Sequence, residues 1–247
     1  MNNLPTTSVL LCECSISEAM PADQLKAVKA VLAETHAAVT HVDDLCGAVE
    51  NSRRGDGPDP LTAAFSKPVT GDDVMIIIAC AERAVKSLLN WGKRSGAWPV
   101  CHFLSLRDEH CADTLRGLLM SAPAATASVQ WVNATGEWIP WFPVIDREAC
   151  VNCGKCFDFC LFGVYSQDHE HVVVEHPRAC KNNCPACARV CPVNAIVFPK
   201  FPNAPINGEP LLSGDGEKPG PSILSMRKAA RKTLFSQRFE KKLGPGR

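Results

Sequence analysis

Fourteen cysteines are the residues of this 247-residue chain best suited to chemistry. Eight of them fall into two runs, CVNCGKCFDFC at residues 150–160 and CKNNCPACARVC at residues 180–191. Each run has three closely spaced cysteines and a fourth that follows after three further residues. Thiolates at such spacings bind iron–sulfur clusters or zinc. The two runs therefore predict metal centres.

Zinc is the alternative to iron, because paired CxxC units also make four-thiolate zinc sites. Zinc sites of that kind close with four ligands from local pairs, whereas each run here has an offset fourth cysteine. A 4Fe–4S cubane takes three thiolates from one tight loop and one from outside. The spacing therefore favours iron–sulfur clusters over zinc.

The two runs resemble those of bacterial ferredoxins with two 4Fe–4S clusters, in which the fourth cysteine of each run ligates the cluster of the other. The resemblance implies one ligand set of Cys150, Cys153, Cys156 and Cys191, and a second of Cys180, Cys184, Cys187 and Cys160. Two departures keep these ligands: Leu161 stands where that family has proline, and three residues instead of two precede Cys184. Two clusters are expected.

A further group of cysteines lies near the ends of predicted strands. Cys12 and Cys14 end the first strand, Cys46 follows the second and Cys80 ends the third. Parallel strands would bring them to one edge of the sheet, where open α/β sheets bind ligands. The alternative is that they are core residues, since buried cysteine commonly serves as a small apolar side chain.

The segments LLCEC (10–14), IIIACAERAVKSLL (76–89) and SLRDEHC (105–111), together with Cys46, resemble in their order the N-terminal domain of the flavin-binding subunit of heterodisulfide reductase. The resemblance covers about residues 7–120. In that family the domain holds a 4Fe–4S cluster, which implies a third cluster on four of Cys12, Cys14, Cys46, Cys80 and Cys111. That family continues into a flavin domain with a GxGxxG fingerprint, which this chain lacks, so no flavin is expected.

Alternating strand and helix patterns position these cysteines. Apolar runs predict strands at 8–14, 38–45, 74–80 and 97–104, and helical periodicity predicts helices at 21–37, 81–96 and 108–120. Strands joined by helices imply an α/β domain with an open, mostly parallel sheet. The predicted domains are this α/β domain at 1–138, a small α+β two-cluster ferredoxin domain at 139–200, a Pro/Gly-rich linker at 201–222 and a basic helical tail at 223–247. The segments 163–167 and 171–175 predict a hairpin between the cysteine runs.

Charge is distributed unevenly along the chain. Residues 217–247 carry nine Lys or Arg against two Glu, whereas residues 1–216 carry seventeen against twenty-four acidic residues. The basic tail is predicted to dock on an acidic redox partner, in preference to anionic lipid or nucleic acid; a solvated tail is the alternative. No apolar run is long enough for a transmembrane segment and no signal-like start is seen, so a cytoplasmic protein is expected.

These features together predict an iron–sulfur electron-transfer protein that relays single electrons between redox partners, as a component of an oxidoreductase complex more than as a stand-alone enzyme. No catalytic base, nucleophile elbow or phosphate loop is recognised. One alternative is a reductase that acts on a substrate such as a disulfide through the N-terminal centre. Another is a scaffold in which clusters only stabilise a cysteine-rich fold.

Overall fold

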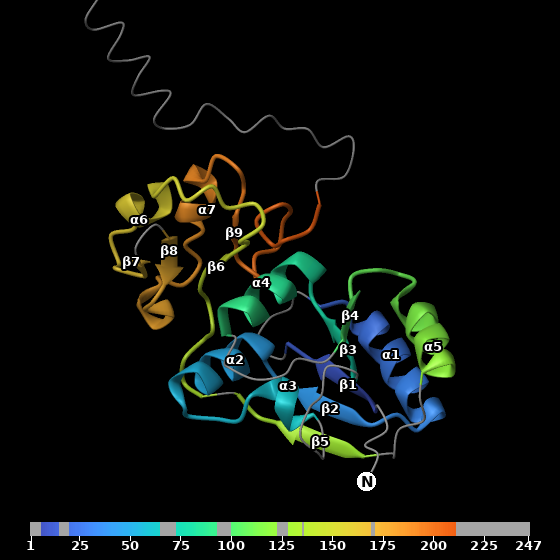
Figure 1. The fold of residues 1–247 in the computed structure, drawn as a ribbon. Helices are drawn as coiled ribbons and strands as arrows, with labels where there is room; N and C mark the ends of the chain where they lie inside the picture. The colour runs from blue at the N-terminus through green and yellow to red at the C-terminus, as the bar shows by residue number, and fades with distance from the viewer. Residues whose placement is uncertain are drawn as a thin grey trace, which may run out of the picture. The chain divides into compact units, whose positions relative to one another are not determined.

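A computed structural model describes residues 6–14, 20–64, 73–92, 100–122, 128–134, 136–168 and 171–210 (Figure 1). These residues belong to one compact unit, which ends at Pro210. The predicted tail at 223–247 and the linker residues 211–222 lie outside the described residues. Every helix in the described ranges is too short or too polar to cross a membrane.

Five parallel strands form the sheet of the first half, in the order β4-β3-β1-β2-β5. The strands are β1 (Thr7–Cys12), β2 (Val39–Val42), β3 (Val74–Ala79), β4 (Val100–Ser105) and β5 (Val129–Val132). β1 pairs with both β2 and β3, so the chain order reverses beside the central strand. The predicted parallel α/β sheet is confirmed, with β5 as an additional strand. Such a reversal makes the carboxyl end of β1 and β3 the edge where α/β sheets bind ligands.

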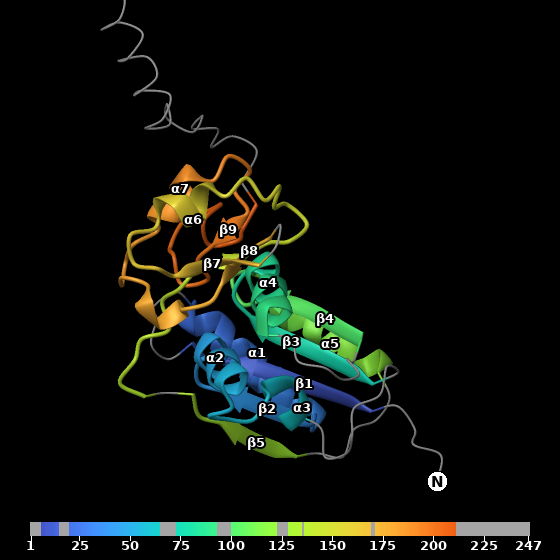
Figure 2. The same ribbon diagram turned by 60° about the vertical axis from the view of Figure 1, so that its left-hand side comes forward.

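Helices cover both faces of this sheet (Figures 1 and 2). One face packs on α1 (Ala22–Thr35) and α5 (Cys111–Ser121), and the other on α2 (Leu45–Arg54), α3 (Pro60–Ala63) and α4 (Glu82–Gly92). Alternate residues of β1 serve the two faces: Val9 and Leu11 belong to the core of the first, and Leu10 and Cys12 to that of the second. Cysteines at the strand ends can therefore lie on different faces.

The second half of the described chain, residues 136–210, consists of short elements around the two cysteine runs. It contains β6 (Val144–Ile145), α6 (Lys155–Phe159), β7 (Tyr165–Asp168), β8 (His171–Val174), the 3₁₀ helix η1 (Pro177–Ala179), α7 (Ala186–Val190) and β9 (Ile196–Val197). β6 pairs antiparallel with β9, and β7 with β8. The predicted hairpin between the runs is thereby confirmed, with Tyr165 opposite Val174.

One hydrophobic cluster contains residues of both halves, and each half also has a cluster of its own. Phe142, Val144 and Val197 of the second half pack in the same buried cluster as Leu10 and Met75 of the sheet. Hydrogen bonds close the junction at its edge, where the indole Nε1 of Trp91 donates to the carbonyl of Val174 at 2.8 Å. The second half therefore rests directly on the face of the sheet that carries α2 and α4.

Residues 201–210, the first part of the predicted linker, are folded and not extended. The backbone N–H of Phe198 donates to the carbonyl of Ile206 at 2.7 Å, and Asn207 is fully buried. Gly208 has a φ of +90°, and a Cβ there would lie 2.9 Å from the backbone nitrogen of Ala84. The segment thus packs closely against α4. The Pro and Gly content of this segment predicts a linker, and composition alone does not reveal that the segment packs on α4.

Candidate metal centres

The first cysteine run forms a tight loop that leads into α6. Asn152 and Gly154 both have left-handed backbone, with φ of 51° and 72°. Glycine adopts this conformation without strain and asparagine tolerates it better than most residues, so the sequence suits the turn. Gly154 also ends the loop, because its carbonyl accepts the hydrogen bond from Asp158 that starts α6. The loop thereby brings Cys156 into the first turn of the helix.

Cys156 lies near cysteines from both runs. It is buried, and burial together with the nearby thiols of Cys191 and Cys150 raises its pKa to about 11. Cys191 thus joins the first run from a distance of thirty-five positions along the chain. Its Sγ accepts a hydrogen bond from the N–H of Ala195 at 3.2 Å. Cys153, the remaining predicted ligand of this set, is exposed.

The second grouping mirrors the first. Burial raises the pKa of Cys180 to about 12, with contributions from the nearby thiols of Cys187, Cys184 and Cys160. Cys160 comes from the first run, so the cysteines gather across the runs here too. The additional residue between the first two cysteines of this run is accommodated at Asn183, whose φ is +58°.

The chemistry of these donors fits an iron–sulfur cluster. Burial raises the pKa of Cys187 to about 12, so its thiolate form requires a compensating positive charge, which bound iron would provide. The buried hydroxyl of Tyr165 has no nitrogen or oxygen partner among the described residues and lies beside Cys187, where a cluster sulfur would accept its hydrogen bond. Within the same residues, no three His, Cys, Asp or Glu side chains are close enough to hold a single metal ion.

A third group of cysteines surrounds a pocket at the carboxyl edge of the sheet. The pocket lies where β1 and β3 end and α2 begins. It is lined by Cys12, Cys14, Cys46 and Cys80, with Asp44, Pro199 and Lys200 among the other lining residues. Four of the five predicted N-terminal candidates are thus brought together by the fold.

The start of α2 orients the cysteines on one side of this pocket. Asp44 is the N-cap, and its Oδ1 accepts a hydrogen bond from the N–H of Gly47 at 3.0 Å. The N–H of Leu45 donates to the Sγ of Cys12 at 3.3 Å. Cys46 follows in the first turn, so the helix supplies one thiol and one N–H donor to sulfur. Hydrogen bonds of this kind tune iron–sulfur centres.

The backbone after β1 orients the CxC pair. Cys14 has a φ of +48°, a left-handed conformation that costs free energy for a residue other than glycine. The turn lets its thiol interact with that of Cys12, and this hydrogen bond, followed by burial, raises the pKa of Cys12 well above its ordinary value. Burial likewise raises the pKa of Cys46, and that of Cys80 to about 11.

Cys111 does not take part in this pocket. It lies at the start of α5 on the opposite face of the sheet, in a core with Ile78, Leu106 and Leu115. Burial in that core, followed by Asp108, raises its pKa to about 11. Its inclusion among the candidate ligands is not supported by the fold, because the sequence did not reveal on which face of the sheet each cysteine lies.

Lys200 is the residue of this pocket that sequence reasoning missed. It follows β9, and its side chain is only 6% exposed. Its Nζ donates to the Oδ2 of Asp44 at 2.5 Å and lies 4.0 Å from the Sγ of Cys14. The available signal was a single lysine inside the otherwise apolar segment IVFPKF. That signal does not indicate which partner the lysine meets.

Comparisons with known proteins find matches for part of the chain. A family described as a 4Fe-4S binding domain matches residues 142–165. An uncharacterised ferredoxin of Methanocaldococcus jannaschii is 48% identical over 62 residues, which are 25% of this chain and 42% of that protein. Pyruvate synthase subunit PorD of the same organism is 39% identical over 64 residues, 26% of this chain and 73% of PorD. Ferredoxin-3 of Nostoc sp. is 34% identical over 85 residues, 27% of this chain and 87% of that ferredoxin.

These matches differ in how much of each relative they cover. The chain spans less than half the length of the uncharacterised ferredoxin, but more than two thirds of PorD and of Ferredoxin-3. In each case the match involves about a quarter of this chain. The resemblance to the heterodisulfide reductase domain at residues 7–120 stays a prediction.

Proposed function

The chain belongs to the 4Fe–4S ferredoxin family, and on that premise we propose that it relays single electrons through three centres, two in its second half and one at the edge of the α/β sheet. When bound, each cluster supplies reversible one-electron chemistry. The residues of the chain hold the clusters, bury them and donate hydrogen bonds to their sulfurs. A reduced redox protein supplies each electron and an oxidised one removes it, so no bond in the chain changes.

The observation that carries the proposal is the gathering of cysteines across the two runs. Cys191 stands with Cys150 and Cys156, and Cys160 stands with Cys180 and Cys187. A zinc site built from neighbouring pairs would not need this exchange. Crossed ligation is what two adjacent cubanes require, since each takes its fourth thiolate from the other loop.

The N-terminal pocket supports a third centre on Cys12, Cys14, Cys46 and Cys80. Three buried cysteines and the partly buried Cys80 line the same pocket, and their number matches the ligand number of a cubane. The resemblance to the heterodisulfide reductase domain points to the same chemistry. The sequence offers five candidate cysteines for four ligand positions. Because Cys111 lies on the opposite face of the sheet, the proposed ligands are the other four.

Burial of the pocket favours electron relay over direct reduction of a substrate. Cys12, Cys14 and Cys46 are each at most 7% exposed, Cys80 is partly buried, and Pro199 and Lys200 of the second half line the same pocket. A disulfide substrate would need to reach a sulfur or an iron at this place. An electron requires no such opening, so a site with three buried cysteines suits electron transfer better than binding of a disulfide.

The partner proposed is an oxidoreductase complex. PorD, a relative of the second half, is by name a subunit of pyruvate synthase. By analogy, the α/β half and the basic tail of this chain would be the parts that a larger complex recognises. Localisation in the cytoplasm belongs to the same proposal.

Iron counting tests the proposed function. Full-length protein reconstituted without oxygen is expected to hold about 12 iron atoms per chain, and the double variant C12A/C46A about 8. Both proteins should be reduced reversibly by dithionite, which a purely structural scaffold would not require. A wild-type count of about 8 would remove the third centre, and zinc in place of iron would overturn the proposal as a whole.

A further inference from the structure

Lys200 is a buried cation placed among thiols. Its side chain is 6% exposed, and that of its partner Asp44 is fully buried. Burying a lysine costs several kcal/mol unless its charge is compensated and its hydrogen bonds are made. The carboxylate of Asp44 compensates one charge, and the Sγ of Cys14 lies 4.0 Å from Nζ on another side.

The position of this ammonium group is fixed from both halves of the protein. Asp44 is held as the N-cap of α2 by the N–H of Gly47. The backbone at Lys200 is held by a turn in which the N–H of Phe201 donates to the carbonyl of Phe198 at 2.9 Å. A long, flexible side chain is thereby confined between two anchored points. Its charge stays in one place relative to the cysteines.

The field of this charge extends over the pocket. Burial alone lowers the pKa of Lys200, but Cys46, Asp44 and Cys14 outweigh burial and raise it above its ordinary value. Lys200 lines the same pocket as Cys12, Cys14, Cys46 and Cys80. The charge of Lys200 therefore lies at the pocket that all four cysteines line, 4.0 Å from the sulfur of Cys14.

We propose that Lys200 sets the reduction potential of the N-terminal centre by holding a fixed positive charge beside its ligands. This inference rests on the proposed third centre. Reduction adds one electron, and thus one negative charge, to the centre without making or breaking a bond. A nearby ammonium group stabilises that added charge, and the potential of an iron–sulfur centre responds to net charge and to hydrogen bonds at its sulfurs.

Lys200 also makes the α/β half dependent on the second half. The positioning charge is 156 residues away from Asp44 along the chain, and it reaches the pocket only when the segment after β9 is packed in place. The N-terminal centre therefore has its tuned potential only in the assembled protein. Lys200 acts as a positioning residue in this arrangement, because it acts through the ligands and need not touch the iron.

A redox titration of full-length protein, followed by electron paramagnetic resonance, tests the inference. The signal of the N-terminal centre is identified as the one that C12A/C46A lacks. In K200M and K200Q this signal is expected to titrate at a more negative potential than in wild type, while the other two centres keep theirs. K200R, which retains the charge, is expected to restore the wild-type value. K86M is the matched control, since Lys86 is half exposed and pairs with Glu82 on the surface of α4.

The outcomes separate this inference from the proposed function. A wild-type protein without the third centre is recognised by its iron count, and both proposals then fail at that site. A third centre that is present in K200M and K200Q with an unchanged potential overturns only the role of Lys200. If these two variants cannot be loaded, K200R decides: loading at the wild-type potential supports a role for the charge, and failure to load shows that Lys200 serves only to build the pocket.

Discussion

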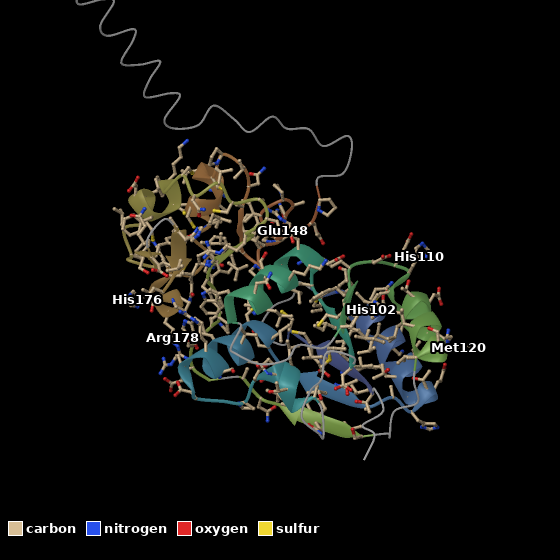
Figure 3. The ribbon with its side chains drawn as sticks, in the orientation of Figure 1. His102, His110, Met120, Glu148, His176 and Arg178 are labelled. Atoms are coloured by element: carbon tan, nitrogen blue, oxygen red, sulfur yellow. The ribbon has the colours of Figure 1, made fainter. Side chains whose placement is uncertain are left out.

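The guanidinium group of Arg178 donates two hydrogen bonds to the carboxylate of Glu50, from Nε to Oε1 at 2.9 Å and from Nη2 to Oε2 at 2.7 Å. Arg178 belongs to η1, directly before Cys180, and Glu50 belongs to α2, the helix that carries Cys46. Figure 3 shows Arg178 at the lower end of the second half, beside this helix. The guanidinium also stacks on Trp138, 4.7 Å from the ring centroid.

Replacing Arg178 with alanine is expected to destabilise the protein by about 2 kcal/mol, because Glu50 is only 3% exposed and would lose both charged hydrogen bonds. The measurement is urea denaturation of the loaded protein without oxygen, followed by tryptophan fluorescence. R54A is the control, since Arg54 forms an exposed pair with Asp56 and its loss should change the free energy of unfolding by less than about 0.5 kcal/mol. If R178A and R54A lowered the free energy of unfolding equally, the pair of Arg178 and Glu50 would have no special role in stability.

Crossed ligation predicts which cluster each cysteine variant damages. C191A should perturb the centre of Cys150 and Cys156, and C160A the centre of Cys180 and Cys187, because each of these cysteines stands with the other run. Mössbauer and electron paramagnetic resonance spectra of each variant distinguish the two centres. C153A provides the uncrossed comparison, since it should affect only the centre of its own run. If C191A and C187A abolish the same signal and leave the other intact, the crossed assignment is wrong.

The two faces of the sheet predict different results for two N-terminal cysteines. C80A should reduce the iron content by up to about 4 atoms per chain, because Cys80 lines the pocket. C111A should leave it unchanged, because Cys111 packs with Leu115 on the opposite face. Iron analysis of both variants, prepared side by side without oxygen, makes the comparison. Loss of iron from C111A alone would show that the ligand set has been misassigned.

The basic tail is predicted to act in partner binding and not in cluster binding. Deletion of residues 223–247 removes eight Lys or Arg and one Glu, and no cysteine. The iron content and the visible spectrum should therefore stay unchanged. Recovery of an acidic redox partner should weaken at low salt and differ little at high salt, since screening suppresses contacts between exposed charges. Unchanged recovery at low salt would leave the tail without this role.

Local signals in the sequence were sufficient for part of the structure. The apolar run at 74–80 and the alternating helix patterns predicted β3, α1, α4 and α5, because each depends on neighbours a few positions away. α2 was missed although Asp44 is a good N-cap, because Gly47 and Asn51 within it are poor helix formers. Its stability comes instead from packing, with Leu45 and Val49 in the core.

The candidate sites also include parts that local sequence patterns predict and parts that depend on tertiary packing. The cysteine spacing at 150–160 is a local pattern, and it was enough to indicate clusters. The choice among the N-terminal cysteines depends on which face of the sheet each residue meets, and periodicity alone did not place Cys111. Lys200 meets Asp44 only through tertiary packing across the whole chain. No local pattern connects those two residues.

The core that Leu10 and Met75 share with Val144 and Val197 has a consequence for how this protein loses its structure. Unfolding either half would expose apolar side chains of the other to water, so each half contributes to the stability of the other. Gly208, pressed against Ala84, extends this dependence almost to Pro210. Heating should therefore produce one cooperative transition, in which the α/β sheet and the cysteine-rich half melt at the same temperature.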